Sequence, residues 1–109
     1  MAVPATRRIT LDELVALNDE MIALVRSGVP LETGLLSLGT DLPGRLGALA
    51  TALGRRLAAG ESLADSLDES GTGFPRAYRA VVAAGIRSGQ LPSALEGIAT
   101  AARRAADLR

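Results

Sequence analysis

Apolar residues recur every three or four positions along most of this chain, which is the spacing of one face of an α-helix. Leu14, Leu17 and Met21 form one such stripe, and Leu49 and Leu53 belong to another. Glycine and proline separate the stripes. The pattern predicts helices over about 11–27, 30–39, 46–60, 62–67, 74–88 and 91–106, with a loop at Ser70–Gly73.

Small apolar residues dominate the composition, and this favours closely packed helices over a sheet. Of the 109 residues, 48% are hydrophobic but only 2% are aromatic, and the length suits a single domain. We therefore predict an all-α fold, a compact bundle of about six short antiparallel helices. Residues 1–10 are expected to be a flexible lead-in and 11–106 the helical domain. Residues 107–109 are expected to be a tail that leads to a membrane span in a longer protein.

The stretch from Ala83 to Leu91 predicts a tight corner between two helices. Gly89 suits the left-handed conformation that ends a helix, and Pro92 suits the first turn of the next one. Similar corners are predicted after two earlier glycines, each of which precedes a pair of leucines four residues apart. Any bundle with tight turns reuses this chemistry, so the repeat alone identifies no family. The residues assigned a structural turn role are Gly28, Pro30, Gly60, Phe74, Pro75, Gly85 and Gly89.

The reactive residues of most enzymes are missing from this chain. It contains no His, no Cys and no Lys, which supply the commonest general base, the thiolate nucleophile and the Schiff-base amine. Its 12 basic and 12 acidic residues give zero net charge, so no bulk charge attracts nucleic acid or acidic lipid. No apolar run approaches the roughly 20 residues of a membrane helix. We predict a non-enzymatic protein without a cofactor.

A cluster of carboxylates leaves one alternative open. Glu61, Asp65, Asp68 and Glu69 lie on and around the fourth predicted helix, and oxygen ligands of this kind bind hard cations such as calcium. Acidic residues near a helix N-terminus are also expected from the helix dipole alone. The solvated acidic face is therefore the favoured interpretation, and no metal site is assigned.

The corner could also belong to a DNA-reading helix–turn–helix. Its second helix, however, begins with Ser93 and Glu96 and carries Arg103 and Arg104 only near its end, where cations suit the helix dipole. We therefore predict no nucleic-acid partner.

Several ordered motifs carry a resemblance to a known family. They are a leucine-rich stretch at 24–35 with Gly-Val-Pro-Leu at its centre, Gly-x-Ser-Leu-x-x-x-Leu at 60–67, Phe74-Pro75, and Ala-Gly-x-x-Ser-Gly-x-Leu at 84–91. Residues 14–102 thereby resemble the repeated cytoplasmic domain of the type II secretion F-protein family. Its members are inner-membrane platform proteins of type II secretion, type IV pilus and tight-adherence machines. The resemblance implies an all-helical domain of about six helices.

The chain departs from the family pattern within the corner, where Ile86 stands in place of the usual Glu. Because Ile86 lies four residues after Val82, it extends the same apolar stripe. We expect the end of this helix to provide extra packing or a hydrophobic contact surface. The predicted partner-binding residues are Val82, Ile86, Arg87 and Ser88.

The resemblance also implies partners and a location. The expected partners are the assembly ATPase, other inner-membrane subunits or a second copy, as a homodimer. The chain itself is expected to be soluble and to lie on the cytoplasmic side of a bacterial inner membrane. Contact with the membrane would come only through further segments, which the arginines near the C-terminus suit. The alternative is a freestanding soluble adaptor or oligomerisation domain with the same fold and no role in secretion.

Overall fold

Six helices make up the part of the chain that the computed structural model describes, residues 8–67 and 73–108. They are α1 (Leu11–Ser27), α2 (Leu31–Asp41), α3 (Gly44–Ala58), α4 (Leu63–Ser66), α5 (Arg76–Arg87) and α6 (Leu91–Asp107). The predicted all-α class is confirmed. The loop predicted at Ser70–Gly73 lies outside the described residues, apart from Gly73.

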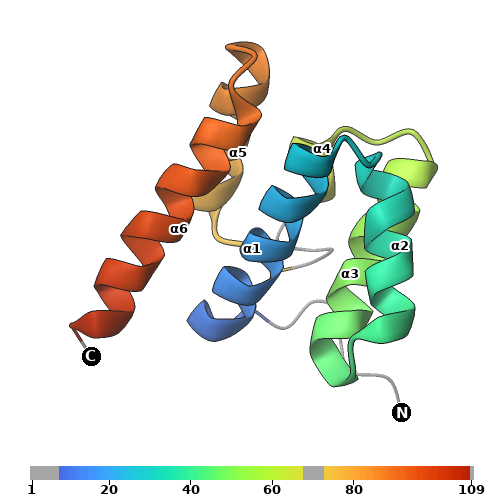
Figure 1. Cartoon of the computed structure of the whole chain (residues 1–109), viewed down its shortest axis with the longest axis horizontal. Helices are drawn as coiled ribbons and strands as arrows, with labels where there is room; N and C mark the ends of the chain where they lie inside the picture. Colours follow the sequence, from blue (N-terminus) through green and yellow to red (C-terminus); the bar gives the residue numbers. More distant parts are fainter. Residues whose placement is uncertain (1–7, 68–72, 109) are drawn as a thin grey trace.

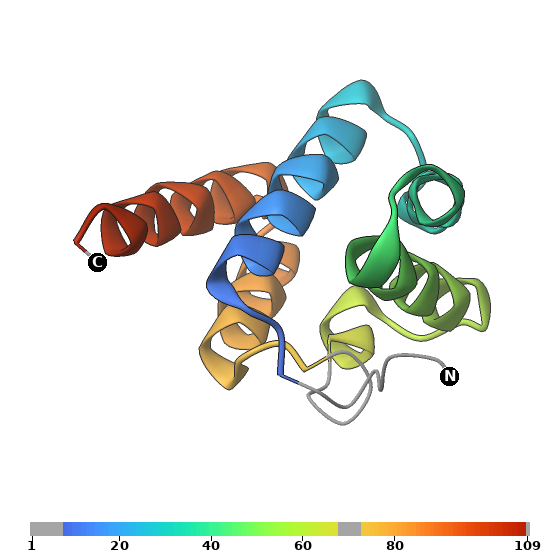
Figure 2. The same cartoon turned by 90° about the horizontal axis from the view of Figure 1, so that it is seen from below.

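Helix α1 lies between two antiparallel helical hairpins (Figure 1). Hairpin α2–α3 packs on one side of α1, and hairpin α5–α6 packs on the other side through α6. The single-turn helix α4 contacts both α3 and α5 and so connects the two sides. Seen from below, the two hairpins remain separated by α1 (Figure 2). The Cα radius of gyration is 12.9 Å, close to the roughly 13 Å expected for a compact domain of this length.

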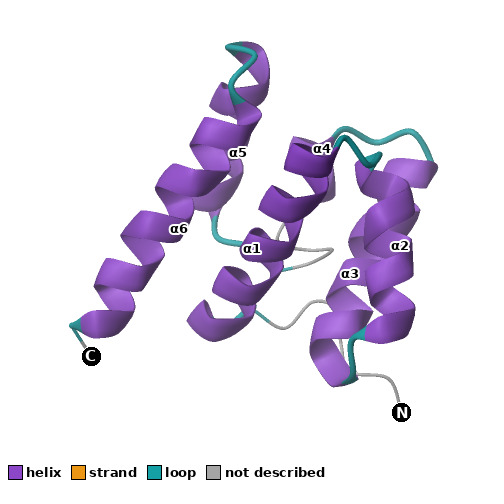
Figure 3. Ribbon diagram, in the orientation of Figure 1, coloured by secondary structure: helices purple, strands orange, loops and turns teal. Residues whose placement is uncertain are grey.

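Helices α1, α3 and α5 all end at one end of the molecule, the upper end in Figure 3. Each is closed by the same pair of hydrogen bonds. After α5, the Gln90 amide donates to the Gly85 carbonyl at 2.8 Å and the Gly89 amide donates to the Ile86 carbonyl at 3.1 Å. Gly28 and Gly60 take the place of Gly89 in the corners after α1 and α3. This Schellman arrangement needs a residue with positive φ, which is 69° at Gly89.

The starts of the helices follow the caps expected from the sequence. The Thr10 amide donates to Glu13 Oε1 at 2.9 Å and the Glu13 amide donates to Thr10 Oγ1 at 3.1 Å, which together form a capping box. The Ser62 hydroxyl accepts a bond from the Asp65 amide at 3.1 Å. Pro30 and Pro75 are the N-cap residues of α2 and α5.

Two glycines serve close helix contacts and do not end helices. The prediction that Gly39 ends the second helix is wrong, because α2 continues to Asp41. A Cβ added at Gly39 would lie 2.0 Å from the Thr51 hydroxyl oxygen of α3. Gly85 likewise lies inside α5, where an added Cβ would lie 2.6 Å from the Ala94 Cβ. Gly85 thus allows α5 and α6 to approach closely, and its carbonyl accepts the bond from the Gln90 amide that closes the turn at Gly89.

The core is built mainly from leucines, and α5, which has none, contributes Tyr78 and Val82. The rings of Phe74 and Tyr78 pack against each other with centroids 4.9 Å apart. Phe74 is only 1% exposed, so it is a core residue that leads into α5. The fully buried large side chains are Leu17, Asn18, Met21, Leu35, Leu49, Leu53, Ser66, Leu67, Phe74, Val82 and Leu95. None of the helices in the described residues is both long and apolar enough to cross a membrane.

Candidate functional site

The predicted contact residues lie at the end of α5 and differ in exposure. Ile86 is 44% exposed, and Arg87 and Ser88 are also exposed. Val82 is fully buried, so its side chain lies beneath this surface and not on it. The Ser88 hydroxyl donates to the Gly85 carbonyl at 3.2 Å, which directs it back to the helix end. The exposed residues of the corner therefore include the apolar Ile86 and the basic Arg87, which follows it in sequence.

An open apolar groove, which the sequence analysis did not predict, lies where α5 and α6 meet the start of α1. Its volume is about 310 Å³. It is lined by Leu11, Leu14, Pro75, Ala77, Tyr78, Val81, Ile98, Ala101 and Ala102. Neighbouring residues on a helix point about 100° apart, so Val81 and Val82 cannot both face the core. The spacing therefore indicates that one of the two valines lies at the surface, and the structure shows that it is Val81, which is 42% exposed.

A buried polar cluster joins α1 to the α5–α6 hairpin. The Asn18 side-chain amide donates to the Leu95 carbonyl at 2.9 Å, and Asn18 Oδ1 accepts from the Tyr78 hydroxyl at 2.7 Å. Burial raises the pKa of the Tyr78 phenol above its ordinary value, so the hydroxyl stays protonated and remains a donor. Both side chains are satisfied within the fold. The cluster therefore positions the hairpin and does not form an open binding site.

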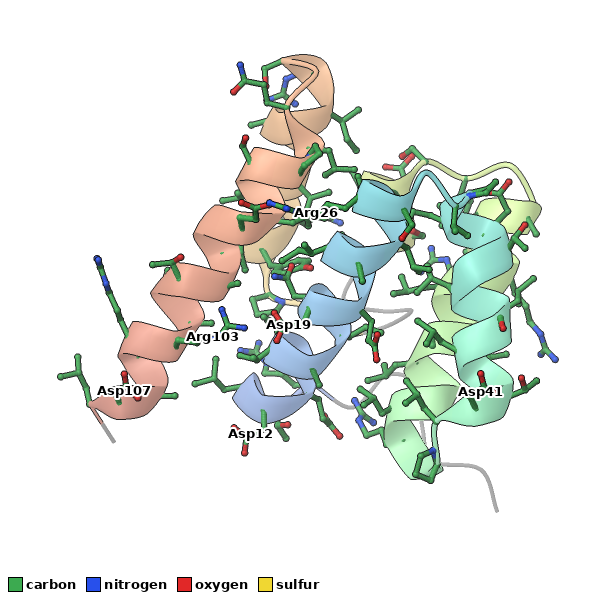
Figure 4. All side chains as sticks on the ribbon, viewed as in Figure 1. Asp12, Asp19, Arg26, Asp41, Arg103 and Asp107 are labelled. Atoms are coloured by element: carbon green, nitrogen blue, oxygen red, sulfur yellow. The ribbon has the colours of Figure 1, made fainter. Side chains whose placement is uncertain are left out.

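Two ion pairs bridge α1 and α6 on the surface, where Figure 4 shows Arg26, Asp19 and Arg103 between the two helices. Arg103 bonds both carboxylate oxygens of Asp19 at 2.9 Å, and Arg26 pairs with Glu96. All four side chains are at least 41% exposed. Glu96 and Arg103, which the DNA-reading alternative would place against nucleic acid, thus have partners within the chain.

The acidic cluster around α4 is described only in part. Glu61 pairs with Arg56 at 2.9 Å, and Asp65 is exposed next to the start of α4. Asp68 and Glu69 lie outside the described residues. Within the described ranges, no three or more acidic side chains gather closely enough to hold a metal ion. Of the two carboxylates that can be placed here, Glu61 forms an ion pair, and Asp65 lies in the first turn of α4, where a negative charge suits the helix dipole.

Two further hollows have polar linings. One, of about 480 Å³, lies between α2 and α3 and includes Gly39, Thr51 and Arg55. The other, of about 400 Å³, lies between α4 and α5 and includes Asp65, Arg76 and Arg79. Neither hollow is lined by His, Cys or Lys, which the chain does not contain. Among the large apolar residues of α5, Val81 and Ile86 are exposed.

Comparison with known proteins gives a consistent result. A family model described as "Type II secretion system (T2SS), protein F" matches residues 18–109. The chain is 33% identical over 94 residues to type II secretion system protein F of Pseudomonas aeruginosa, which covers 85% of this chain and 23% of that protein. It is 32% identical over 105 residues to the Vibrio cholerae protein of the same name, which covers 94% of this chain and 26% of that protein. The chain thus spans about a quarter of the length of these relatives.

Proposed function

This chain belongs to the type II secretion system protein F family, and we propose that it is a protein-interaction domain of an inner-membrane platform in a secretion or pilus-assembly machine. The observation that most directly supports this proposal is Ile86 at the end of α5, which is 44% exposed and is followed in sequence by Arg87. A rigid helical body with an apolar contact surface is what a scaffold needs. No catalytic role is proposed, because the chain lacks the residues that most enzymes use.

The exposed residues of the corner suggest which kinds of side chain a partner would place against them. Apolar side chains and arginine are enriched in the buried centres of protein interfaces, where they fill pockets and pair with carboxylates. Ile86 and Arg87 are adjacent in sequence at a corner that two Schellman hydrogen bonds hold in place. We therefore expect a partner with an apolar pocket and a carboxylate beside it. The assembly ATPase and the cytoplasmic parts of other inner-membrane subunits are the proposed candidates.

Site-specific photocrosslinking in the native host tests this proposal. A photoreactive amino acid at position 86 of the full protein should form an adduct with another machine subunit. The matched control places the same residue at Ala48, which is exposed on α3. Adducts at 86 and not at 48 support the proposed surface. Equal labelling at both positions, or no adduct at 86, would refute it.

A freestanding adaptor with the same fold is the competing function, and cell fractionation separates the two. The platform proposal places the native protein in the inner-membrane fraction, together with the other subunits. Recovery of the whole pool from the soluble fraction would favour the adaptor, because a platform protein reaches the membrane through further segments of its chain.

A further inference from the structure

We propose that the hollow between α4 and α5 binds a carboxylate side chain from an acidic segment of a partner protein, through Arg76 and Arg79. The hollow has a volume of about 400 Å³ and is lined by Ala64, Asp65, Arg76, Arg79, Ala80 and Ala83. Arg76 lies about 15 Å along the helix axis from Ile86, the residue on which the proposed function rests. The proposal therefore concerns a second surface and does not depend on the first.

The two arginines of this hollow have no ionic partner among the residues that the structure describes. Arg76 is exposed and Arg79 is partly exposed, and neither forms an ion pair with Asp65, although it lines the same hollow. Four other arginines in the described ranges do form ion pairs with carboxylates of the chain: Arg26, Arg45, Arg56 and Arg103. The guanidinium groups at the start of α5 are therefore available to a ligand, and their planar donor geometry matches that of a carboxylate.

Helix stability does not account for the position of these arginines. The N-terminus of a helix carries a partial positive charge, so basic residues in its first turn are unfavourable. Helix α5 nevertheless begins with Arg76, has Arg79 three residues later and contains no acidic residue in its first turn. Its N-cap, Pro75, makes no side-chain hydrogen bond. Helix α1, by contrast, has Asp12 and Glu13 in its first turn. A carboxylate bound at the start of α5 would offset both the arginine charges and the helix dipole.

The lining of the hollow favours a carboxylate of a protein segment over a membrane surface. Two arginines and one aspartate leave a net charge of +1 around the hollow, which a single carboxylate neutralises. Acidic lipid is typically recognised by clusters of about four to eight basic residues, whereas this hollow has two. The three alanines of the lining provide apolar surface that the CH₂ groups of a bound glutamate can cover.

Fluorescence anisotropy with a defined probe tests the proposal on the 109-residue chain. The probe is a fluorescein-labelled alanine peptide with glutamate at every fourth position, and the control peptide has glutamine in place of each glutamate. At low salt the glutamate peptide should bind at least about fivefold more tightly than the glutamine peptide, because the expected pairing is electrostatic. Arg76→Gln combined with Arg79→Gln should abolish this difference.

A matched control variant removes the same charge elsewhere. Arg55→Gln combined with Arg104→Gln replaces two exposed arginines, which likewise form no ion pair within the described residues, and should preserve the preference for the glutamate peptide. Failure of the glutamate peptide to bind, equal binding of the two peptides, or an equal loss in the two variants would overturn the proposal.

Two further measurements test the other possible occupants of the hollow. The melting temperature of the variant with glutamine at 76 and 79 should be unchanged or higher at low salt, because positive charge leaves a helix N-terminus. A lower melting temperature that high salt restores would mean that carboxylates of the chain itself hold the arginines, and would contradict the proposal. Sedimentation with vesicles of phosphatidylethanolamine and phosphatidylglycerol tests the membrane, and we expect no dependence on the two arginines. Vesicle binding that is lost with them would assign the hollow to lipid instead.

Discussion

The two hairpins of this bundle are held on the same helix by different physical means. On the α2–α3 side, Gly34 of α2 lies so close to α1 that an added Cβ would be 2.5 Å from Leu24, while Gly39 and Gly54 allow close contact between α2 and α3 within the hairpin. On the α5–α6 side, the hairpin is joined to α1 by Asn18, by two exposed ion pairs and by partly filled apolar surface. Even the turns differ: α2 ends in extended backbone at Leu42, whereas α5 ends in left-handed Gly89.

Helix α1 is thus packed against its two neighbouring hairpins through different kinds of contact. Close steric contact fixes α2 and α3 through shape and tolerates almost no added volume. On the α5–α6 side, buried apolar packing is supplemented by the directional hydrogen bonds of Asn18, and an open groove leaves room beside the contact. We therefore expect the first side to respond most to added volume, and the second to respond to lost hydrogen bonds and to backbone strain.

Gly47→Ala should have the largest effect, because it adds volume where α2 leads into α3. Its Cβ would lie 2.1 Å from the Leu42 carbonyl oxygen, a backbone atom that cannot move without displacing the turn. We expect a loss of about 3 kcal/mol in the free energy of unfolding, measured by urea denaturation. The matched control is Gly97→Ala, which enters open space in an exposed part of α6. It should gain up to about 1 kcal/mol from helix propensity. Equal effects at the two sites would contradict the steric account.

Gly89→Val should cost about 1–2 kcal/mol, and only through backbone strain. An added Cβ at Gly89 meets nothing within 4 Å, but φ is +69°, which a β-branched residue adopts poorly. Thermal unfolding checks this loss. Gly89→Asn is the control, because asparagine tolerates the left-handed conformation and should cost less than half as much. A melting temperature that is unchanged in the Val variant would rule out this account of the corner.

Gly85→Ala should cost about 1 kcal/mol, since its clash with the Ala94 Cβ is partly offset by better helix propensity. Ala94→Gly removes the methyl group with which an alanine at position 85 would clash, so the double variant tests this contact directly. We expect Ala94→Gly to be less harmful in the Gly85→Ala background than in the original chain, by about 1 kcal/mol in a double-mutant cycle. Additive effects would mean that the two positions do not meet.

The sequence was informative about local structure and less so about contacts between helices. The corners at Gly28, Gly60 and Gly89 were predictable because a positive-φ closure leaves a local signature of glycine, a cap and spaced leucines. The contact roles of Gly39 and Gly85 were not, because a glycine inside a helix looks the same in sequence as one that ends it. Only the neighbouring helix distinguishes them. For the same reason, the burial of Val82 and the exposure of Val81 depended on how α5 is rotated against α6.

The smallest predicted effect concerns the ion pair that links α1 to the α2–α3 side. Arg45 Nε lies 3.2 Å from Glu13 Oε1, and the two side chains are only 8% and 21% exposed, respectively. Burial alone would raise the pKa of Glu13. The hydrogen bond from the Thr10 amide and the nearby Arg45 guanidinium outweigh burial, and they hold the pKa below its ordinary value of 4.5. A carboxylate with a lowered folded-state pKa stabilises the fold above its unfolded pKa, and this stabilisation is lost as the pH falls.

Acid should therefore weaken the contact between α1 and α3 as Glu13 becomes protonated. Between pH 7 and pH 3, Glu13→Gln should flatten the decline in unfolding free energy by up to about 1 kcal/mol relative to the original chain. Glutamine keeps an acceptor for the Thr10 amide and removes only the charge. Other carboxylates titrate in both proteins, so the difference between the two curves isolates Glu13. Parallel curves would show that the Arg45 pair contributes nothing, and that α1 holds the α2–α3 hairpin by shape alone.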